Sequence, residues 1–221
     1  MKEILILVPN YNGENNILKI FQKINDLNLN NIKILFIDDG SNDKSLQILK
    51  NNNIEHIFHK NNKGKGEAIK SGIDHAFKNK FKWIITIDSD LQHSPNKIQD
   101  FINLRNKKTI ILGWRKSKKN MPILRIFSNV ITSLLISLRT KTKILDSQCG
   151  FRMFPVNVIN DFKCVESGFQ YESEFLIRAV MNGYKINHVQ IPTIYNNEKS
   201  SMRNVPDTFK FITMYLKSFF W

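Results

Sequence analysis

The sequence predicts an α/β domain with a mostly parallel central sheet and helices on both of its faces. Apolar, β-branched runs typical of buried strands alternate four times with segments of helical periodicity. Polar or flexible residues follow each of these strands, and ligands gather at the carboxyl ends of parallel strands. The last of the four runs, residues 83–87, continues directly into two carboxylates, Asp88 and Asp90. We therefore expect a ligand site at one edge of the sheet.

Four strands are expected in the first half of the chain, over residues 4–8, 32–37, 54–58 and 83–87. Helices should connect them, because apolar residues such as Ile17, Phe21 and Ile24 keep helical spacing after the first strand. The loops that follow the strands cover residues 9–13, 38–41, 62–66 and 88–93.

The second half adds further strands and the most apolar segment of the chain. Strands are expected over residues 109–113 and 186–191, and the end of segment 146–154 is also strand-like. A helix is expected through Phe175 and Val180. Segment 121–140 is rich in Ile, Leu, Val and Phe. Such a segment is either a buried core helix or a helix that lies in a membrane surface with its apolar side down.

No linker or internal repeat divides the 221 residues. We expect one domain over residues 1–204, including an amphipathic helix at about 121–140, and a C-terminal amphipathic helix over 205–221. The chain ends in Phe219, Phe220 and Trp221, which suits membrane anchoring or packing against the 121–140 helix. The N-terminus lacks the long apolar region of a signal peptide, and no stretch of about 18 uninterrupted apolar residues indicates a membrane span.

Composition and charge place the protein among globular proteins with anionic partners. The 33 Lys and Arg residues outnumber the 19 Asp and Glu residues, for a net charge of +14. Such a surface favours nucleic acid, anionic lipid or phosphorylated substrates, without choosing among them. Cys149 and Cys164 are the two cysteines of the chain, too few for a disulfide framework, so we expect reduced thiols in a cytosolic protein.

The two carboxylates after the central strand indicate a metal site. Asp88 and Asp90 lie two residues apart, so in extended backbone they point the same way. Carboxylate oxygens suit Mg²⁺ or Mn²⁺, and a divalent cation there would neutralise a diphosphate and help it to leave. Taken alone, the Asp-x-Asp pattern is also common in solvated loops.

Eight short motifs follow one another along the chain. The motifs are Val-Pro-Asn-Tyr-Asn (8–12), Ile-Asp-Asp-Gly-Ser (37–41), Asn-Lys-Gly-Lys-Gly (62–66), Asp-Ser-Asp-Leu-Gln-His (88–93), Gly-Trp-Arg (113–115), Asp-Ser-Gln-Cys-Gly-Phe-Arg (146–152), Tyr-Glu-Ser-Glu (171–174) and Glu-Lys-Ser-Ser (198–201). In this order they resemble family 2 glycosyltransferases of GT-A fold, and within that family they are most similar to the dolichyl- or polyprenyl-phosphate sugar transferase branch. The resemblance covers roughly residues 4–211. Gly13 stands where the family usually has Glu, with Glu14 beside it.

The resemblance implies a role for each matching residue. A nucleotide-sugar donor would contact Pro9, Tyr11, Asn12, Glu14, Asp38, Asp39, Lys65, Asp88, Ser89, Arg152, Lys199 and Ser201. Asp88, Asp90 and Gln92 would hold Mg²⁺ or Mn²⁺. The catalytic group would be Asp90, Arg115, Glu172 and Glu174. Arg115 and Arg152 would lie near the diphosphate or an incoming lipid phosphate, and Glu172 or Glu174 would be the base for a hydroxyl acceptor.

The implied reaction is an inverting transfer of a sugar from a GDP- or UDP-sugar to a polyprenyl phosphate. A phosphate acceptor is already anionic near neutral pH, so positioning and charge neutralisation would carry the rate. The alternative acceptor is a glycan hydroxyl. Together with the apolar segments, this reaction predicts a peripheral enzyme on an anionic membrane surface, at the cytoplasmic face of the cytoplasmic membrane.

Two other classes explain the sequence less well. A sugar-1-phosphate nucleotidyltransferase normally carries a Gly-rich loop after its first strand, and residues 9–13 do not form one. A nucleic-acid binder would account for the +14 charge. However, no zinc pattern, RNP motif or evident recognition helix is present, so we expect no nucleic-acid partner.

Overall fold

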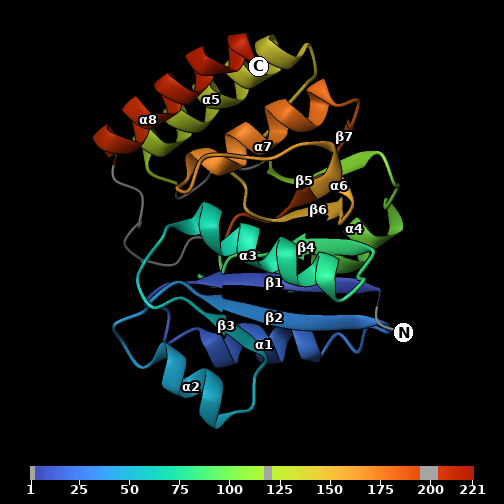
Figure 1. The fold of residues 1–221 in the computed structure, drawn as a ribbon, viewed down its shortest axis with the longest axis vertical. Coiled ribbons are helices and arrows are strands. Elements are labelled where there is room, and N and C mark those ends of the chain that lie inside the picture. The colour runs from blue at the N-terminus through green and yellow to red at the C-terminus, as the bar shows by residue number, and fades with distance from the viewer. Residues whose placement is uncertain (1–2, 117–120, 195–203) are drawn as a thin grey trace.

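A computed structural model of the chain describes residues 3–116, 121–194 and 204–221 (Figure 1). Its seven-stranded sheet has the order β3-β2-β1-β4-β6-β5-β7. The strands are β1 (Ile4–Asn10), β2 (Ile32–Asp38), β3 (His56–Phe58), β4 (Trp83–Thr86), β5 (Thr109–Arg115), β6 (Arg152–Pro155) and β7 (Lys185–Ile191). β6 runs antiparallel to its neighbours β4 and β5, and the other strand pairs are parallel. The expected mostly parallel sheet is confirmed.

The antiparallel direction of β6 determines which chain segment lies at the ligand edge of the sheet. Arg152, its first residue, pairs with Thr86 near the end of β4 and with Leu112 of β5. The segment that enters β6, residues 146–151, therefore lies at the same sheet edge as the carboxyl ends of β4 and β5. One antiparallel strand thus adds a second polar segment to the ligand edge.

Helices cover both faces of the sheet, as predicted. The helical elements are α1 (Ile17–Asn25), α2 (Ser45–Asn51), α3 (Lys65–Lys78), η1 (Pro95–Lys97), α4 (Ile98–Asn103), α5 (Ile123–Thr140), α6 (Val158–Asp161), α7 (Gln170–Met181), α8 (Asn204–Lys217) and η2 (Ser218–Phe220). Alternate residues of β1 enter two different cores. Leu5 and Leu7 pack with residues of α3 and α7, whereas Ile6 and Val8 pack with residues of α1 and α4.

Helices α5 and α8 lie side by side as an outer layer beyond α7 (Figure 1). Tyr215 of α8 donates its hydroxyl to the Leu135 carbonyl of α5 at 3.2 Å. Phe211 and Met214 of α8 are buried in the larger core. The C-terminal helix therefore packs on the same domain as the rest of the described chain.

Candidate active site

Asp88 lies at the centre of the site, directly after β4. Its Oδ1 is 2.7 Å from the Lys65 ammonium. Burial alone would raise the pKa of this carboxyl, but the charge and hydrogen bond of Lys65, together with the charges of neighbouring groups such as Arg152, lower the pKa. The backbone of Gly150 lies against the carboxylate, since a Cβ at that position would be 2.3 Å from Asp88 Oδ2. Asp88 is thus an ionised carboxylate held between a lysine and a glycine.

Lys65, the first residue of α3, joins two acids that come from different elements. Its Nζ lies 2.7 Å from Asp88 Oδ1 and 3.1 Å from Oε1 of Glu172, which is in the first turn of α7. The side chains are 17%, 22% and 8% exposed for Lys65, Asp88 and Glu172. Burial alone would lower the pKa of Lys65, but the two carboxylates raise it above its ordinary value. The structure therefore brings together three of the residues predicted from the motifs.

The glycines beside Lys65 permit close packing of α3 against the start of α7. Gly64 has φ +98°, a conformation that favours glycine, and a Cβ there would lie 2.6 Å from the Ser167 carbonyl oxygen. A Cβ on Gly66 would lie 2.7 Å from the same oxygen. These glycines let the N-terminal end of α3 lie close enough to α7 for Lys65 to reach Glu172.

The loop after Asp88 is tightly turned. Oδ1 of Asp90 accepts a hydrogen bond from the Gln92 main-chain N–H at 3.0 Å. Leu91 between them has φ +60°, which costs a non-glycine residue about 1–3 kcal/mol. Ser89, Asp90 and Gln92 are all half-buried.

The loops after β1 and β2 carry residues that the motifs predict to contact the nucleotide. Asp38 is fully buried, and its Oδ1 accepts from the Asn10 amide at 3.1 Å and from the Ser41 hydroxyl at 2.5 Å. Asn12 accepts from the Asn42 main-chain N–H at 2.8 Å, as Glu14 does from that of Lys44. These contacts join the two loops.

The packing of the loop after β1 explains why a glycine stands at position 13. A Cβ on Gly13 would lie 2.2 Å from Asn10 Oδ1, so the Asn10 side chain fills that space. Pro9 beside it is buried, whereas Tyr11 is 44% exposed at the sheet edge.

Asp39 holds the next loop in place. Its carboxylate accepts from the main-chain N–H groups of Lys63 and Gly64 and lies 2.6 Å from His59 Nδ1. The other ring nitrogen of His59 is 2.9 Å from the Ser71 hydroxyl of α3. Sequence reasoning missed His59, which lies outside the motifs and yet anchors the residues that lead to Lys65.

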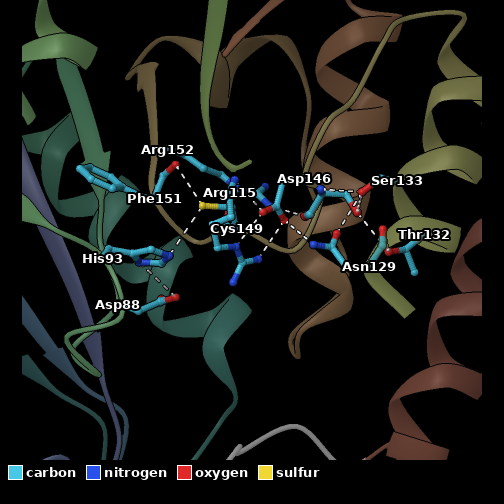
Figure 2. Close-up of polar contacts among 11 residues, drawn as sticks. Asp88, His93, Arg115, Asn129, Thr132, Ser133, Asp146, Cys149, Phe151 and Arg152 are labelled. Carbon is cyan, nitrogen blue, oxygen red and sulfur yellow. Dashed lines mark hydrogen bonds and ion pairs between the residues drawn. The ribbon is translucent and has the colours of Figure 1, made fainter. Parts of the chain in front are cut away.

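Arg115, at the end of β5, forms a two-point ion pair with Asp146 (Figure 2). The Nε–Oδ2 and Nη2–Oδ1 distances are 2.7 and 2.9 Å. Asp146 Oδ1 also accepts from the Asn129 amide of α5 at 2.8 Å. Burial alone would raise the pKa of Asp146, but the hydrogen bonds and charge of Arg115 lower it. The guanidinium is therefore fixed at the ligand edge.

Two other predicted residues are placed differently from expectation. Arg152 is 3% exposed and donates to the carbonyls of Cys149, Ser147 and Glu172 at 2.8 Å each. Glu174 is 1% exposed, accepts from the Val165 and Glu166 main-chain N–H groups and pairs with Arg178 at 2.7 Å. Both side chains hold the fold together in this structure, and neither is positioned to contact a substrate.

His93 and Cys149 form a second group that sequence reasoning did not assign. The Cys149 thiol lies 3.7 Å from His93 Nε2, and His93 Nδ1 lies 3.9 Å from Asp88 Oδ2 (Figure 2). Burial lowers the pKa of His93 to about 4 and raises the pKa of the Cys149 thiol to about 12. A neutral imidazole therefore lies beside Asp88, and a neutral thiol lies beside that imidazole.

The donor atoms at this edge fit a hard divalent cation. Asp88 and Asp90 offer carboxylate oxygens, and Gln92 offers an amide oxygen. Within the described ranges, no cluster of three or more His, Cys, Asp or Glu side chains could hold a metal. Oxygens from a bound diphosphate would have to complete the coordination. Lys199 and Ser201, the predicted closing loop, lie outside the described residues.

Comparisons with known proteins identify the family of this chain. The family model described as glycosyl transferase family 2 matches residues 5–162. The UDP-N-acetylglucosamine–dolichyl-phosphate N-acetylglucosaminyltransferase of Methanococcus voltae is 31% identical over 88% of this chain and 86% of its own. The dodecaprenyl-phosphate galacturonate synthase of Rhizobium johnstonii is 24% identical over 73% of this chain and 50% of its own.

A solved structure shows the same fold. Glucosyl-3-phosphoglycerate synthase from Mycobacterium tuberculosis, in complex with Mn²⁺, UDP and glucosyl-3-phosphoglycerate, has a TM-score of 0.75 to this chain. The match covers 98% of this chain and 80% of that one at 16% sequence identity. The predicted GT-A fold is therefore confirmed.

Proposed function

We propose a specific reaction for this chain, which belongs to glycosyl transferase family 2 and is a glycosyltransferase. In this reaction the enzyme moves a sugar from a nucleotide diphosphate to a polyprenyl phosphate. The convergence of Asp88, Lys65, Glu172 and Arg115 at one sheet edge carries the proposal. The names of two relatives, a dolichyl-phosphate and a dodecaprenyl-phosphate enzyme, support a lipid phosphate as the acceptor. A UDP- or GDP-sugar is the proposed donor.

Each group has a task in this reaction. Asp88, Asp90 and Gln92 would hold Mg²⁺ or Mn²⁺, which neutralises charge on the departing diphosphate. Asp38, Asn12 and the loops they join would receive the nucleoside. Arg115, fixed by Asp146, would position an anionic acceptor.

The displacement needs no proton transfer. One oxygen of the acceptor phosphate forms the bond to the anomeric carbon as the bond to the diphosphate oxygen breaks, and the diphosphate leaves with the electron pair. Glu172 is paired with Lys65, and Glu174 is engaged by two N–H groups and Arg178. Neither arrangement is that of a free base, which suits an acceptor that is already anionic.

A transfer assay tests the function. Purified protein with Mg²⁺ or Mn²⁺ should transfer labelled sugar from one member of a UDP- and GDP-sugar panel to a short polyprenyl phosphate. EDTA should stop the transfer, and Asp90→Ala should slow it by about 10²–10³-fold, the usual cost of losing a group that stabilises transition-state charge.

Two results of this assay would contradict the proposal. Undiminished turnover in Asp90→Ala, or with EDTA present, would refute the metal role. Transfer to a glycan hydroxyl alone, abolished in Glu172→Gln, would favour the hydroxyl-acceptor reaction with Glu172 as its base.

The polarity of α5 supports a membrane-bound position for this enzyme. Its buried residues are Asn129, Thr132, Ser133 and Ile136, so the inner side of the helix is largely polar. Its outer side is apolar, with exposed fractions of 83% at Ile123, 75% at Leu124 and 66% at Phe127. This is the reverse of the usual pattern in a water-soluble domain, and large exposed apolar patches mark binding surfaces.

Helix α8 extends the same apolar surface. Phe209, Leu216 and Phe220 are exposed on α8 and η2, which lie beside α5 (Figure 1). Exposed lysines, including Lys141 and Lys217, accompany the apolar residues and suit anionic headgroups. In the described part of the chain, α5 alone is long and apolar enough to cross a membrane. Its polar hydrogen bonds to residues 146–148 instead support a position along the bilayer surface.

We therefore propose that α5 and α8 dock on anionic lipid at the inner face of the cytoplasmic membrane, where nucleotide sugars are available. The protein should float with anionic vesicles at low salt. Leu124→Glu combined with Phe127→Glu should abolish flotation, because two charges would enter the apolar surface.

The matched control is Phe58→Glu, which places a charge at an exposed aromatic on the edge strand β3. This variant should float like the unmodified protein. Wild-type protein that stays wholly at the bottom of the gradient, or that forms a stable dimer through α5 and α8, would refute membrane docking.

A further inference from the structure

We infer that Lys65 is a tethered cation that occupies Asp88 until a nucleotide arrives, so that divalent metal binding depends on bound nucleotide. This inference rests on the proposed function, because it requires a metal at Asp88. The starting observation is the short Lys65–Asp88 contact of 2.7 Å, which engages the carboxylate that the metal would use.

The charges around Lys65 explain why its contact with Asp88 would oppose metal binding. Lys65 lies between two carboxylates, Asp88 and Glu172, so the group carries one positive and two negative charges. A divalent cation on Asp88 would lie within a few ångströms of the ammonium, and the two positive charges would repel. The side chains are at most 22% exposed, so water screens this repulsion only weakly.

A nucleotide diphosphate removes the conflict. Its oxygens would supply negative charge to both cations, and the flexible stem of Lys65 lets the ammonium move from Asp88 to a phosphate oxygen. The α3 backbone need not move, because the Asp39 carboxylate holds the Lys63 and Gly64 N–H groups and the Glu67 N–H donates to Ser167. Metal and nucleotide should therefore strengthen each other's binding by the same factor.

The protein alone is a poor metal site for a second reason. The described residues hold no cluster of three or more potential His, Cys, Asp or Glu ligands. With one oxygen of Asp88 engaged by Lys65 and Oδ1 of Asp90 capping the Gln92 N–H, few oxygens are available before the nucleotide binds. Lys65 therefore helps to prevent metal from binding ahead of the donor.

The test measures Mn²⁺ binding directly, from the loss of the free Mn²⁺ electron paramagnetic resonance signal, with and without UDP or GDP. Lys65→Met and Lys65→Gln should bind Mn²⁺ alone at least about tenfold more tightly than the unmodified protein, because Asp88 is released from its ion pair. The further increase in their Mn²⁺ affinity when the diphosphate is added should be correspondingly smaller. Lys65→Arg, which keeps the charge, should resemble the unmodified protein.

Lys70 provides the matched control. It lies on the same helix and pairs with Glu67 at 2.8 Å, without contacting Asp88 or Glu172. Lys70→Met should bind Mn²⁺ like the unmodified protein. Circular dichroism would show that all three Lys65 variants are folded.

The outcomes separate the inference from the proposed function. If UDP or GDP promotes Mn²⁺ binding in the unmodified protein, but neither Lys65→Met nor Lys65→Gln binds Mn²⁺ alone more tightly, the tethered-cation inference is wrong. If Mn²⁺ binds to none of the proteins, with or without UDP or GDP, the metal site itself is refuted, and the proposed function fails with it.

Discussion

Replacing Gly150 by alanine should reduce sugar transfer by at least about 100-fold while the protein stays folded, because a misplacement of about 1 Å in a catalytic group costs that much. The new Cβ would lie 2.3 Å from Oδ2 and 2.7 Å from Oδ1 of Asp88. The Gly150 carbonyl accepts from the Thr86 hydroxyl at 2.7 Å, so the backbone is held and the carboxylate must move. Steady-state transfer rates and thermal melting measure the two effects.

Gly183→Ala is the control for this prediction. Gly183 has φ +81° at the end of α7, with nothing within 4 Å of an added Cβ. Alanine there should cost about 1 kcal/mol of stability, because the backbone conformation favours glycine, and should leave transfer unchanged. If the Gly150→Ala protein retains half of the transfer rate of the unmodified protein, Asp88 is not fixed by its contact with Gly150.

Replacing Asp146 by alanine should lower the free energy of unfolding by about 3–5 kcal/mol, the usual cost of removing one partner of a buried ion pair. Arg115 and Asp146 have side chains only 10% and 1% exposed, so the guanidinium would be left buried without its counter-charge. The Asn129 amide of α5 would also lose its acceptor. Denaturant unfolding at neutral pH measures the loss.

The pH dependence of this contribution has a definite sign. Arg115 lowers the pKa of Asp146 in the folded protein, against the raising effect of burial. The stabilisation is therefore complete above the unfolded-state value of about 4 and is lost as the pH falls through the lower folded value. Asp100→Ala, which removes a half-exposed surface pair with Lys97, should change stability far less. An equal loss in both variants would contradict the buried-pair account.

The sequence predicted the fold class and the centre of the site, because both depend on local patterns. Buried strands that end in polar residues indicated that Asp38 and Asp88 lie at the same edge of the sheet, and a motif identified Lys65. The direction of β6 was not predictable, because it depends on pairing with β4 and β5 and not on local residue types. As a result, the closeness of Gly150 to Asp88 had no sequence signal.

The two glutamates of α7 show a second limit. The sequence predicted a helix through Phe175 and Val180, whereas α7 already begins at Gln170 and contains both Glu172 and Glu174. Residues two apart on a helix point about 200° from each other, so only one of them can face the site. Glu172 does so, and Glu174 faces Arg178 and the 165–166 backbone.

The most direct measurement of the central claim is anomalous X-ray scattering from crystals soaked with Mn²⁺ and the nucleotide diphosphate of the active donor. The account predicts one manganese peak bounded by the Asp88 and Asp90 carboxylates and the diphosphate, with the Lys65 ammonium moved off Asp88. A nucleotide bound at this edge without manganese, or manganese bound elsewhere on the protein, would contradict it.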